Sequence, residues 1–193
     1  MYIPKYFEIT NREKIFAFID ANAFGQLISH VDGRLVSSHL PFLISADHRY
    51  LLGHLARPNP QWKDISGQEI LITLQGPHEY ISPTWYSSPG VPTWNYQAVH
   101  IYGKCQAFND PARLKQVVDS LTEKYESAFD QSWKPDYAAS MLRGIVGIEV
   151  EISEIQCKFK LSQNRSDTDQ IQVIEALGAA ESNLVAMAMQ ENR

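Results

Sequence analysis

Residues 25–41 read GQLISHVDGRLVSSHLP, and this stretch decides the fold class. Two strand-like segments flank Asp32-Gly33, a pair that favours a β-hairpin because glycine accepts a positive φ without steric cost. Pro41 cannot donate a hydrogen bond to a neighbouring strand, so the second segment should bulge or lie at a sheet edge there. The stretch therefore predicts an antiparallel sheet built from hairpins.

The rest of the chain adds strands and helices in an order that supports this interpretation. Further strands are expected over 50–54, 69–75, 78–82, 95–107 and 145–161. Helices are expected after a Thr10/Glu13 capping box, within 56–62, after Asp110-Pro111, over 135–143, and once or twice in the C-terminal region, where Gly178 stops the first. Strands and helices do not alternate strictly, which argues against a doubly wound parallel sheet. We expect a mainly β (α+β) fold, a small antiparallel barrel with peripheral helices.

Length and charge exclude several classes of protein. The chain has 193 residues, enough for one domain with an appendage, and a net charge of -5, which argues against a protein that coats nucleic acid. The sequence contains no run of 18 apolar residues, so no transmembrane helix is expected. Residues 1–14 lack the apolar core of a signal peptide. The cysteines, Cys105 and Cys157, lie far apart and are expected to be reduced, so a cytoplasmic location is expected.

Common catalytic and metal-binding motifs are missing from the sequence. It contains no GxGxxG, GxxxxGK[ST], GxSxG or HExxH pattern. The six histidines show no HxH or HxxxH spacing, so we expect no metal site. No catalytic residue can be assigned.

Three polar segments are candidates for ligand binding, each with a structural alternative. In SSHLPF (37–42), the strand interrupted at Pro41 would leave backbone groups free to hydrogen-bond the edge of a heterocycle. The alternative is that Pro41 only protects an edge strand from pairing with another chain. GHLARPNPQW (53–62) offers His54, Arg57, Asn59 and a helix start to an anion, or it is a capped loop. KFKLSQNR (158–165) contains a cluster of cations in an acidic chain, which suggests an anionic partner. The alternative is a solvated strand end.

A fourth feature is the irregular stretch PTWYSSPGVPTW, residues 83–94. It contains three prolines and three of the 21 aromatic residues of the chain. Loops of this length inside a compact domain are usually functional or interfacial. Its rings could stack on a flat ligand or bury a subunit interface.

Seven motifs in order along the chain together resemble one family. They are MYIPKYFE, SSHLPF, GHLARPNPQW, YISPTWY, VPTWNYQAVHIYG, IVGIEVEI and KLSQNR. This series resembles the PaiB family, described as FMN-binding negative transcriptional regulators. The resemblance implies an FMN-binding split β-barrel domain over residues 1–178, like the pyridoxamine-phosphate oxidases, followed by a helical tail over 179–193. It also implies a homodimer with FMN in clefts at the interface.

By analogy with the split barrel, the resemblance assigns cofactor-binding positions. The strand around Ser38, His39 and Pro41 should meet the isoalloxazine ring and ribityl chain, and the stretch from His54 to Asn59 should take the phosphate. The second subunit could supply some of the predicted positions. The full set of predicted cofactor-binding residues is Ser38, His39, Pro41, His54, Arg57, Asn59, Trp62, Trp94, Lys158, Lys160, Ser162 and Gln163.

Several functions stay open at this point. One is an FMN-dependent oxidoreductase-like protein with a small-molecule substrate, in which His39 or His54 could hydrogen-bond or transfer a proton near the flavin. Another is a negative regulator that acts through a partner or DNA without catalysis, although no helix-turn-helix or basic helix face is visible, which puts direct DNA binding in doubt. A minor alternative is haem with a histidine ligand.

Overall fold

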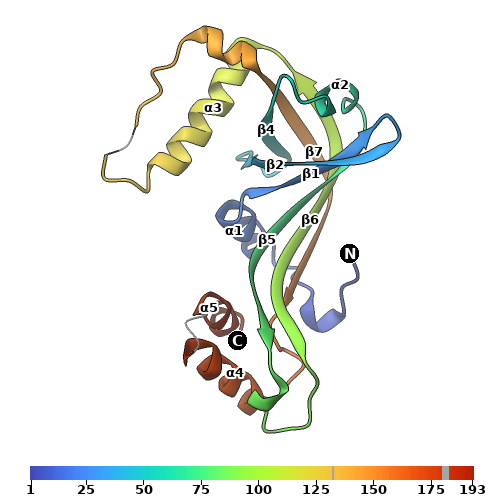
Figure 1. Ribbon diagram of the computed structural model, residues 1–193, viewed down its shortest axis with the longest axis vertical. Helices are drawn as coiled ribbons and strands as arrows, with labels where there is room; N and C mark the ends of the chain where they lie inside the picture. The colour runs from blue at the N-terminus through green and yellow to red at the C-terminus, as the bar shows by residue number, and fades with distance from the viewer. Residues whose placement is uncertain (132, 180–182) are drawn as a thin grey trace. The chain divides into compact units, whose positions relative to one another are not determined.

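The computed structural model describes residues 1–131, 133–179 and 183–193 of the chain. The strands are β1 (Phe24–Val31), β2 (Arg34–Pro41), β3 (Leu43–Ile44), β4 (Tyr50–Ala56), β5 (Glu69–Ile81), β6 (Thr93–Phe108) and β7 (Ile145–Lys160). The helices are α1 (Arg12–Ala21), α2 (Gln61–Asp64), α3 (Pro111–Glu126), α4 (Asp167–Ala179) and α5 (Asn183–Glu191), with 3-10 turns η1 (Lys5–Phe7), η2 (Pro83–Trp85) and η3 (Ala139–Gly144). Figure 1 labels the helices and most of the strands, and the mainly β class is confirmed.

The predicted hairpin begins the sheet. Strands β1 and β2 pair antiparallel from Phe24 opposite Pro41 to Val31 opposite Arg34. The turn residue Asp32 has a φ of 51° and the following glycine a φ of 75°, the pair of positive values that a tight hairpin turn requires. Within the described residues the strand order is β2-β1-β5-β6-β7-β4-β3, so β2 lies at an edge, as its proline predicted.

The chain divides into two compact units. Unit 1 comprises Met1–Phe18, Gln75–Val99 and Gln156–Arg193, and unit 2 comprises Ile19–Leu74 and His100–Ile155. All seven strands contribute to unit 2. Its core is formed by fully buried aliphatic side chains from successive strands, among them Leu27, Leu51, Ile72, Ile101 and Ile148.

The sheet of unit 2 curls because its two edge strands are joined by a single residue. Strands β2 and β3 occupy opposite ends of the strand order, yet only Phe42 separates Pro41 from Leu43. Two chain steps span at most about 7 Å, so the two edges must meet at this point. Phe42 is 1% exposed, and its N–H donates to the carbonyl of Ala23 at 2.9 Å. Among the described residues no ladder joins β2 to β3, so the barrel is split rather than closed.

Gly53 of β4 permits this approach of the two edges. A Cβ built at Gly53 would lie 3.2 Å from the carbonyl oxygen of Pro41 and 3.1 Å from Cδ1 of Leu40. Such contacts are tighter than most side chains accept, so a larger residue would push the end of β2 away from β4. Gly53 therefore sets the geometry between the two segments that the sequence assigned to the cofactor.

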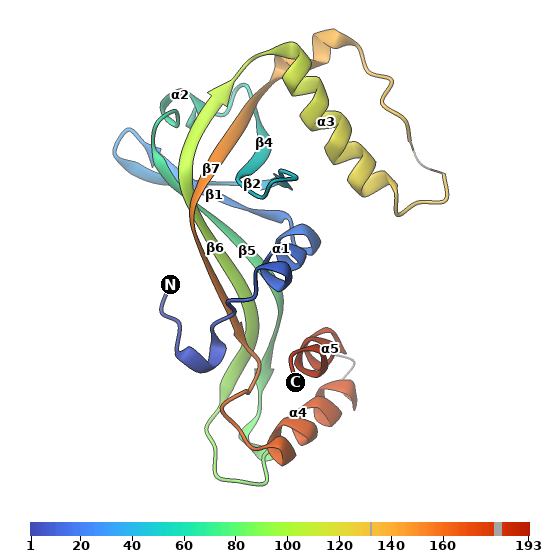
Figure 2. The same cartoon turned by 180° about the vertical axis from the view of Figure 1, so that it is seen from behind.

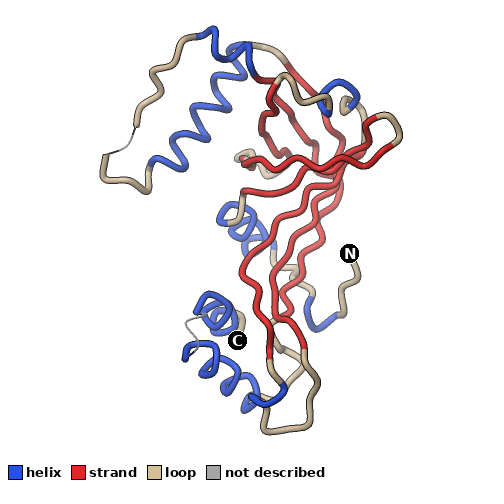
Figure 3. The backbone as a smooth tube through the Cα atoms, viewed as in Figure 1, coloured by secondary structure: helices blue, strands red, loops and turns tan. Residues whose placement is uncertain are grey.

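Some sequence-based boundaries need correction. The strands expected over 69–75 and 78–82 are one strand, β5, which Figure 3 shows without interruption. The first helix begins at Arg12, and Asn11 rather than Thr10 accepts a hydrogen bond from the N–H of Lys14, at 2.8 Å. The helix expected over 135–143 is the 3-10 turn η3. The Asp110 cap of α3 is confirmed by its bond from the N–H of Arg113.

The C-terminal helices belong to unit 1. Figure 2 shows α4 and α5 side by side, and the amide of Asn95 in β6 contacts the Met189 sulfur of α5 at 3.4 Å. The domain boundary expected at residue 178 stays a prediction.

We predict that Phe42→Ala destabilises the protein by about 3–5 kcal/mol, because it removes a buried ring where the sheet edges meet. Urea unfolding followed by circular dichroism measures this loss. Phe129→Ala, at a phenylalanine that is 62% exposed, is the matched control and should cost under about 1 kcal/mol. Equal effects of the two substitutions would contradict the role given to Phe42.

Candidate functional site

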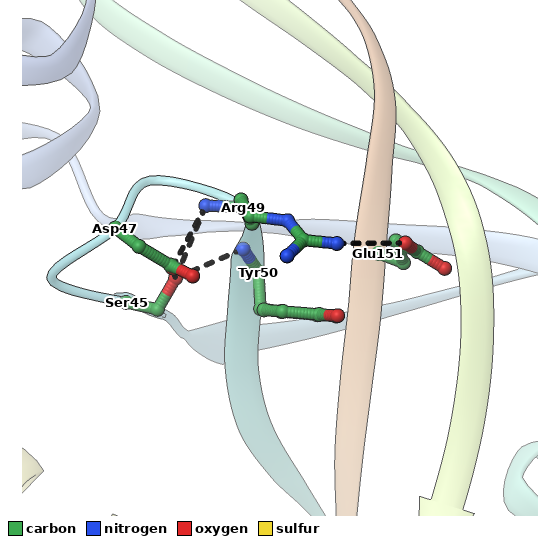
Figure 4. Close-up of polar contacts among 5 residues, drawn as sticks. All are labelled: Ser45, Asp47, Arg49, Tyr50 and Glu151. Carbon is green, nitrogen blue, oxygen red and sulfur yellow. Dashed lines mark hydrogen bonds and ion pairs between the residues drawn. The ribbon is translucent and has the colours of Figure 1, made fainter.

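A polar turn fixes the start of β4 (Figure 4). The Ser45 hydroxyl oxygen accepts from the N–H of Tyr50 at 2.9 Å and donates to Asp47 at 2.6 Å. The Ser45 hydrogen bond, together with the N–H of Arg49, lowers the pKa of Asp47 below its ordinary value. Arg49 also lies 3.6 Å from Glu151 of β7. The turn thus determines where β4 begins beside β7.

His54 of β4 carries an unpartnered buried nitrogen. The strand pairing puts His54 opposite Gly147 of β7. Its Nδ1 is buried and has no hydrogen-bond partner among the described residues. Burial lowers the pKa of His54, so its imidazole is neutral at neutral pH. A buried polar atom without a partner is costly, and such atoms often mark a ligand site. His100 of β6 also has an unpartnered buried Nδ1, and the sequence did not single it out.

Arg57 holds the segment after β4 against the start of β7. Its Nε donates to the Arg143 carbonyl at 2.6 Å, and its Nη2 donates to the Ile145 carbonyl at 2.7 Å and to Asn109 Oδ1 at 2.8 Å. The indole N–H of Trp62 donates to the Arg57 carbonyl at 2.8 Å. A guanidinium has five N–H donors, so the two on Nη1 are the ones left for an anion.

Ser38 and Asn59 meet around a buried glutamine. The Asn59 amide donates to the Ser38 hydroxyl at 2.8 Å, and that hydroxyl donates to Gln61 Oε1 at 2.6 Å. The Gln61 amide donates in turn to Ser29 Oγ at 2.9 Å and to the Leu27 carbonyl at 3.1 Å. Gln61 is fully buried, which its sequence gives no sign of because glutamine is usually exposed. The network anchors α2 to β1 and β2 and connects two predicted cofactor residues.

The opposite face of the hairpin carries two exposed apolar side chains among polar ones. His39 stacks on Phe24 of β1, with ring centroids 6.4 Å apart and planes at 29°. Phe24 is 63% exposed and Leu35 is 64% exposed. Side chains alternate along a strand, so Leu35 and His39 share one face of β2, whereas Ser38 points to the other. Pro41 ends this strand beside Gly53.

The predicted residues near the end of β7 are already bonded within unit 1. Lys160 Nζ donates to Thr93 Oγ1 at 2.6 Å and to the Trp94 carbonyl. Lys158 is 8% exposed, and its Nζ donates to the Tyr2 carbonyl at 3.1 Å.

Ser162 and Gln163 shape the turn that follows β7. Ser162 is buried with a φ of 68°, and its hydroxyl accepts from the Asn95 amide at 3.0 Å. Gln163 Oε1 accepts from the N–H of Leu161 at 2.7 Å, and its amide donates to the Phe159 carbonyl. Both side chains therefore stabilise this turn.

The aromatic loop is anchored to α4 through Asp169, which sequence reasoning missed. Asp169 accepts from the N–H and hydroxyl of Ser87, each at 2.8 Å, and from the hydroxyl of Ser88. These hydrogen bonds hold the pKa of the Asp169 carboxyl well below its ordinary value, and the bond from the Ser88 hydroxyl has the largest effect. Arg165 lies 4.2 Å above the Tyr86 ring in the same loop.

The predicted cofactor residues fall into two groups. Unit 2 holds Ser38, His39, Pro41, His54, Arg57, Asn59 and Trp62, and unit 1 holds Trp94, Lys158, Lys160, Ser162 and Gln163. Two cavities of about 620 Å³ and 480 Å³ lie elsewhere in unit 2, one beside Lys104 and the other beside Trp133, and no predicted cofactor residue lines either. That these twelve residues bind FMN stays a prediction.

Comparison with known proteins identifies the family. The family model described as "putative FMN-binding domain" matches residues 1–154. The chain belongs to this FMN-binding family. It is 44% identical over 185 residues to protease synthase and sporulation protein PAI 2 of Bacillus subtilis, covering 92% of this chain and 89% of that protein. The PaiB resemblance and the FMN cofactor are thereby confirmed.

Solved structures with the same fold also bind flavins according to their descriptions. The flavocytochrome Anf3 of Azotobacter vinelandii has a TM-score of 0.64 at 15% identity and covers 82% of this chain and 72% of its own. The FAD and haem binding protein of Mycobacterium smegmatis has a TM-score of 0.64 at 15% identity and covers 85% of this chain and 78% of its own. At such identity the likeness concerns the fold alone and supports the split-barrel architecture.

The unit 2 residues fit FMN by their chemistry. An edge strand with unpaired backbone groups can meet the polar edge of the isoalloxazine ring, and the Nη1 donors of Arg57 suit a phosphate. The unpartnered Nδ1 of His54 adds a third polar atom.

Within the described residues no helix is long and apolar enough to cross a membrane.

Proposed function

We propose that this chain is a homodimeric flavoprotein regulator that holds FMN on unit 2. The flavin ring meets the edge formed by Ser38, His39 and Pro41, and the phosphate meets the segment from His54 to Asn59. The observation that carries this proposal is the buried, unpartnered Nδ1 of His54 inside the family's FMN-binding region. A bound ligand would relieve the cost of that unpaired atom.

The phosphate contact is proposed for Arg57 Nη1. The other donors of Arg57 grip the carbonyls of Arg143 and Ile145, which hold the guanidinium in one orientation. A guanidinium already fixed in place loses little entropy when it binds an anion. Trp62 supports this arrangement through the Arg57 carbonyl and through its ring, 5.8 Å from the guanidinium carbon.

A regulatory role is supported by the similarity to a Bacillus protein named for protease synthesis and sporulation. Bound FMN supplies one- or two-electron redox chemistry, while the chain positions it and shields it. An oxidoreductase would need a second substrate beside the flavin, and no residue is assigned to catalysis.

Cys105 and Cys157 are free, and burial raises the pKa of each thiol to about 12, which fits the proposed cytoplasmic location.

The proposed dimer uses the exposed face of the β1–β2 hairpin. Phe24 and Leu35 are exposed apolar side chains near opposite ends of this face, and His39 stacks on Phe24. A second copy of the chain that covers the face would remove both apolar side chains from water. A second copy at this edge would also place protein beside the backbone groups proposed to meet the flavin, as the family resemblance implies.

We predict that Arg57→Ala weakens FMN binding at least about tenfold and leaves riboflavin binding unchanged, because only FMN carries the phosphate. Quenching of flavin fluorescence during titration of the purified apoprotein measures both affinities. Arg34→Ala, at an exposed arginine elsewhere in unit 2, is the control.

The two flavins separate the possible results. Equal weakening of FMN and riboflavin would show structural damage rather than a lost phosphate contact, and unchanged FMN affinity would remove Arg57 from the site. A wild-type protein that takes up no FMN, or that shows a haem Soret band instead, would contradict the proposed function itself.

For the dimer, we predict that the double substitution Phe24→Glu with Leu35→Glu converts the protein to a monomer, because it would bury two unpaired charges in the proposed interface. Size-exclusion chromatography with light scattering measures the mass. Tyr125→Glu, at a tyrosine on α3 that is 43% exposed, should leave the dimer intact. A wild-type monomer, or a double variant that remains dimeric, would refute this interface.

A further inference from the structure

A buried glutamine determines which hydrogen bonds the proposed FMN site can offer. The side-chain Nε2 of Gln61 donates to the carbonyls of Leu27 and Val36, at 3.1 Å and 3.2 Å. It also donates to the hydroxyl oxygen of Ser29 at 2.9 Å. Because a carbonyl oxygen can only accept, these bonds establish which end of the amide is the NH2 group. The other end, Oε1, can therefore only accept, and its donor is Ser38.

The hydroxyl of Ser38 consequently has one direction. Its single hydrogen is donated to Gln61 Oε1 at 2.6 Å, and its oxygen accepts one hydrogen bond from Asn59 Nδ2 at 2.8 Å. A hydroxyl oxygen has two acceptor positions, so one remains. Toward a ligand, Ser38 is thus an acceptor and not a donor. Donation of its hydrogen also strengthens the oxygen as an acceptor, since hydrogen bonds in a chain polarise one another.

Asn59 has the complementary role. Its Oδ1 accepts from the backbone N–H of Gln61 at 3.0 Å, which turns its Nδ2 toward Ser38. One of the two Nδ2 hydrogens is used there, and the second remains available. Ser38 and Asn59 are half-buried, so part of each stays open to solvent. A ligand beside them meets one acceptor and one donor at adjacent positions.

The groups of FMN match this pair in one arrangement. Phosphate oxygens accept hydrogen bonds, which suits Asn59, a member of the segment proposed for the phosphate. The donors of FMN are the hydroxyls of the ribityl chain and the N3–H of the ring. Because Ser38 and Asn59 contact each other, the donor that meets Ser38 must be close to the phosphate. The ribityl hydroxyls satisfy this condition, whereas N3–H lies at the opposite end of the molecule.

We propose that Gln61 is a positioning residue of the FMN site, which holds the Ser38 hydroxyl as an acceptor for a hydroxyl of the ribityl chain. This inference rests on the function proposed above. It assigns Ser38 to the ribityl chain and leaves His39 and Pro41 for the ring. The site then selects flavins with a hydroxylated side chain, because a ligand without one leaves the Ser38 oxygen unpaired.

The test is a double-mutant cycle on flavin binding, measured by fluorescence quenching. Gln61→Met and Ser38→Ala should each weaken FMN and riboflavin binding by the same factor, about two- to tenfold, the usual effect of one hydrogen bond. Because Gln61 acts through Ser38, adding Gln61→Met to Ser38→Ala should cause no further loss. Lumiflavin, which has the ring without the ribityl chain, should bind the wild type and these variants equally.

Gln68→Met is the matched control. Gln68 also joins the end of α2 to β1, because its Oε1 accepts from the N–H of His30 at 3.1 Å and its Nε2 donates to the carbonyls of His30 and Asp64, at 2.9 Å and 2.6 Å. None of these bonds involves Ser38. Gln68→Met should therefore leave the affinity for FMN and riboflavin unchanged.

Ser38→Ala provides the test by itself if Gln61→Met does not fold. Unchanged FMN affinity in both variants, additive losses in the cycle, or lumiflavin weakened as much as riboflavin would each overturn the proposal. A loss confined to FMN would also overturn it, since that result would place Ser38 at the phosphate, and so would an equal loss in Gln68→Met. Wild-type protein that binds no FMN would instead contradict the proposed function.

Discussion

The link of one residue between the two edges of the sheet governs the structure of unit 2. Strands β2 and β3 stand at opposite ends of the strand order and are joined only through Phe42. The sheet must curl to satisfy this connection, and Gly53 supplies the space by bringing no side chain against the Pro41 carbonyl. The curl brings the strand that ends at Pro41 beside the strand that carries His54. The proposed flavin site is thus a consequence of how the barrel stays split.

Much of this fold follows from local sequence signals. Asp32-Gly33 predicted the hairpin turn, Pro41 predicted the edge, and Asp110-Pro111 predicted the start of α3, because each depends on backbone preferences that neighbouring residues determine. Boundaries were wrong where tertiary packing overrides such signals. Gly76 and Pro77 read as a break, yet β5 continues through them as one strand.

The candidate site was less predictable than the fold. The segments around Ser38 and Asn59 were identified, but the side chain that joins them, Gln61, has no local signature of burial. Asp169 lies 81 or more residues from the serines that it holds, so only the folded chain reveals the contact. Conversely, Ser162 and Gln163 looked like ligand donors, and the structure shows them bonded to Asn95 and to the backbone around them. A sequence rich in hydrogen-bond donors does not show which of them bond within the folded protein and which stay available to a ligand.

Hydrogen–deuterium exchange of the protein with and without FMN tests the central claim most directly. If unit 2 holds the flavin as proposed, FMN should slow exchange in peptides covering residues 37–42 and 53–62. Helix α3 of the same unit should exchange at an unchanged rate, since no contact with the cofactor is proposed there. Protection confined to other segments, or none in these two while FMN is bound, would contradict the account.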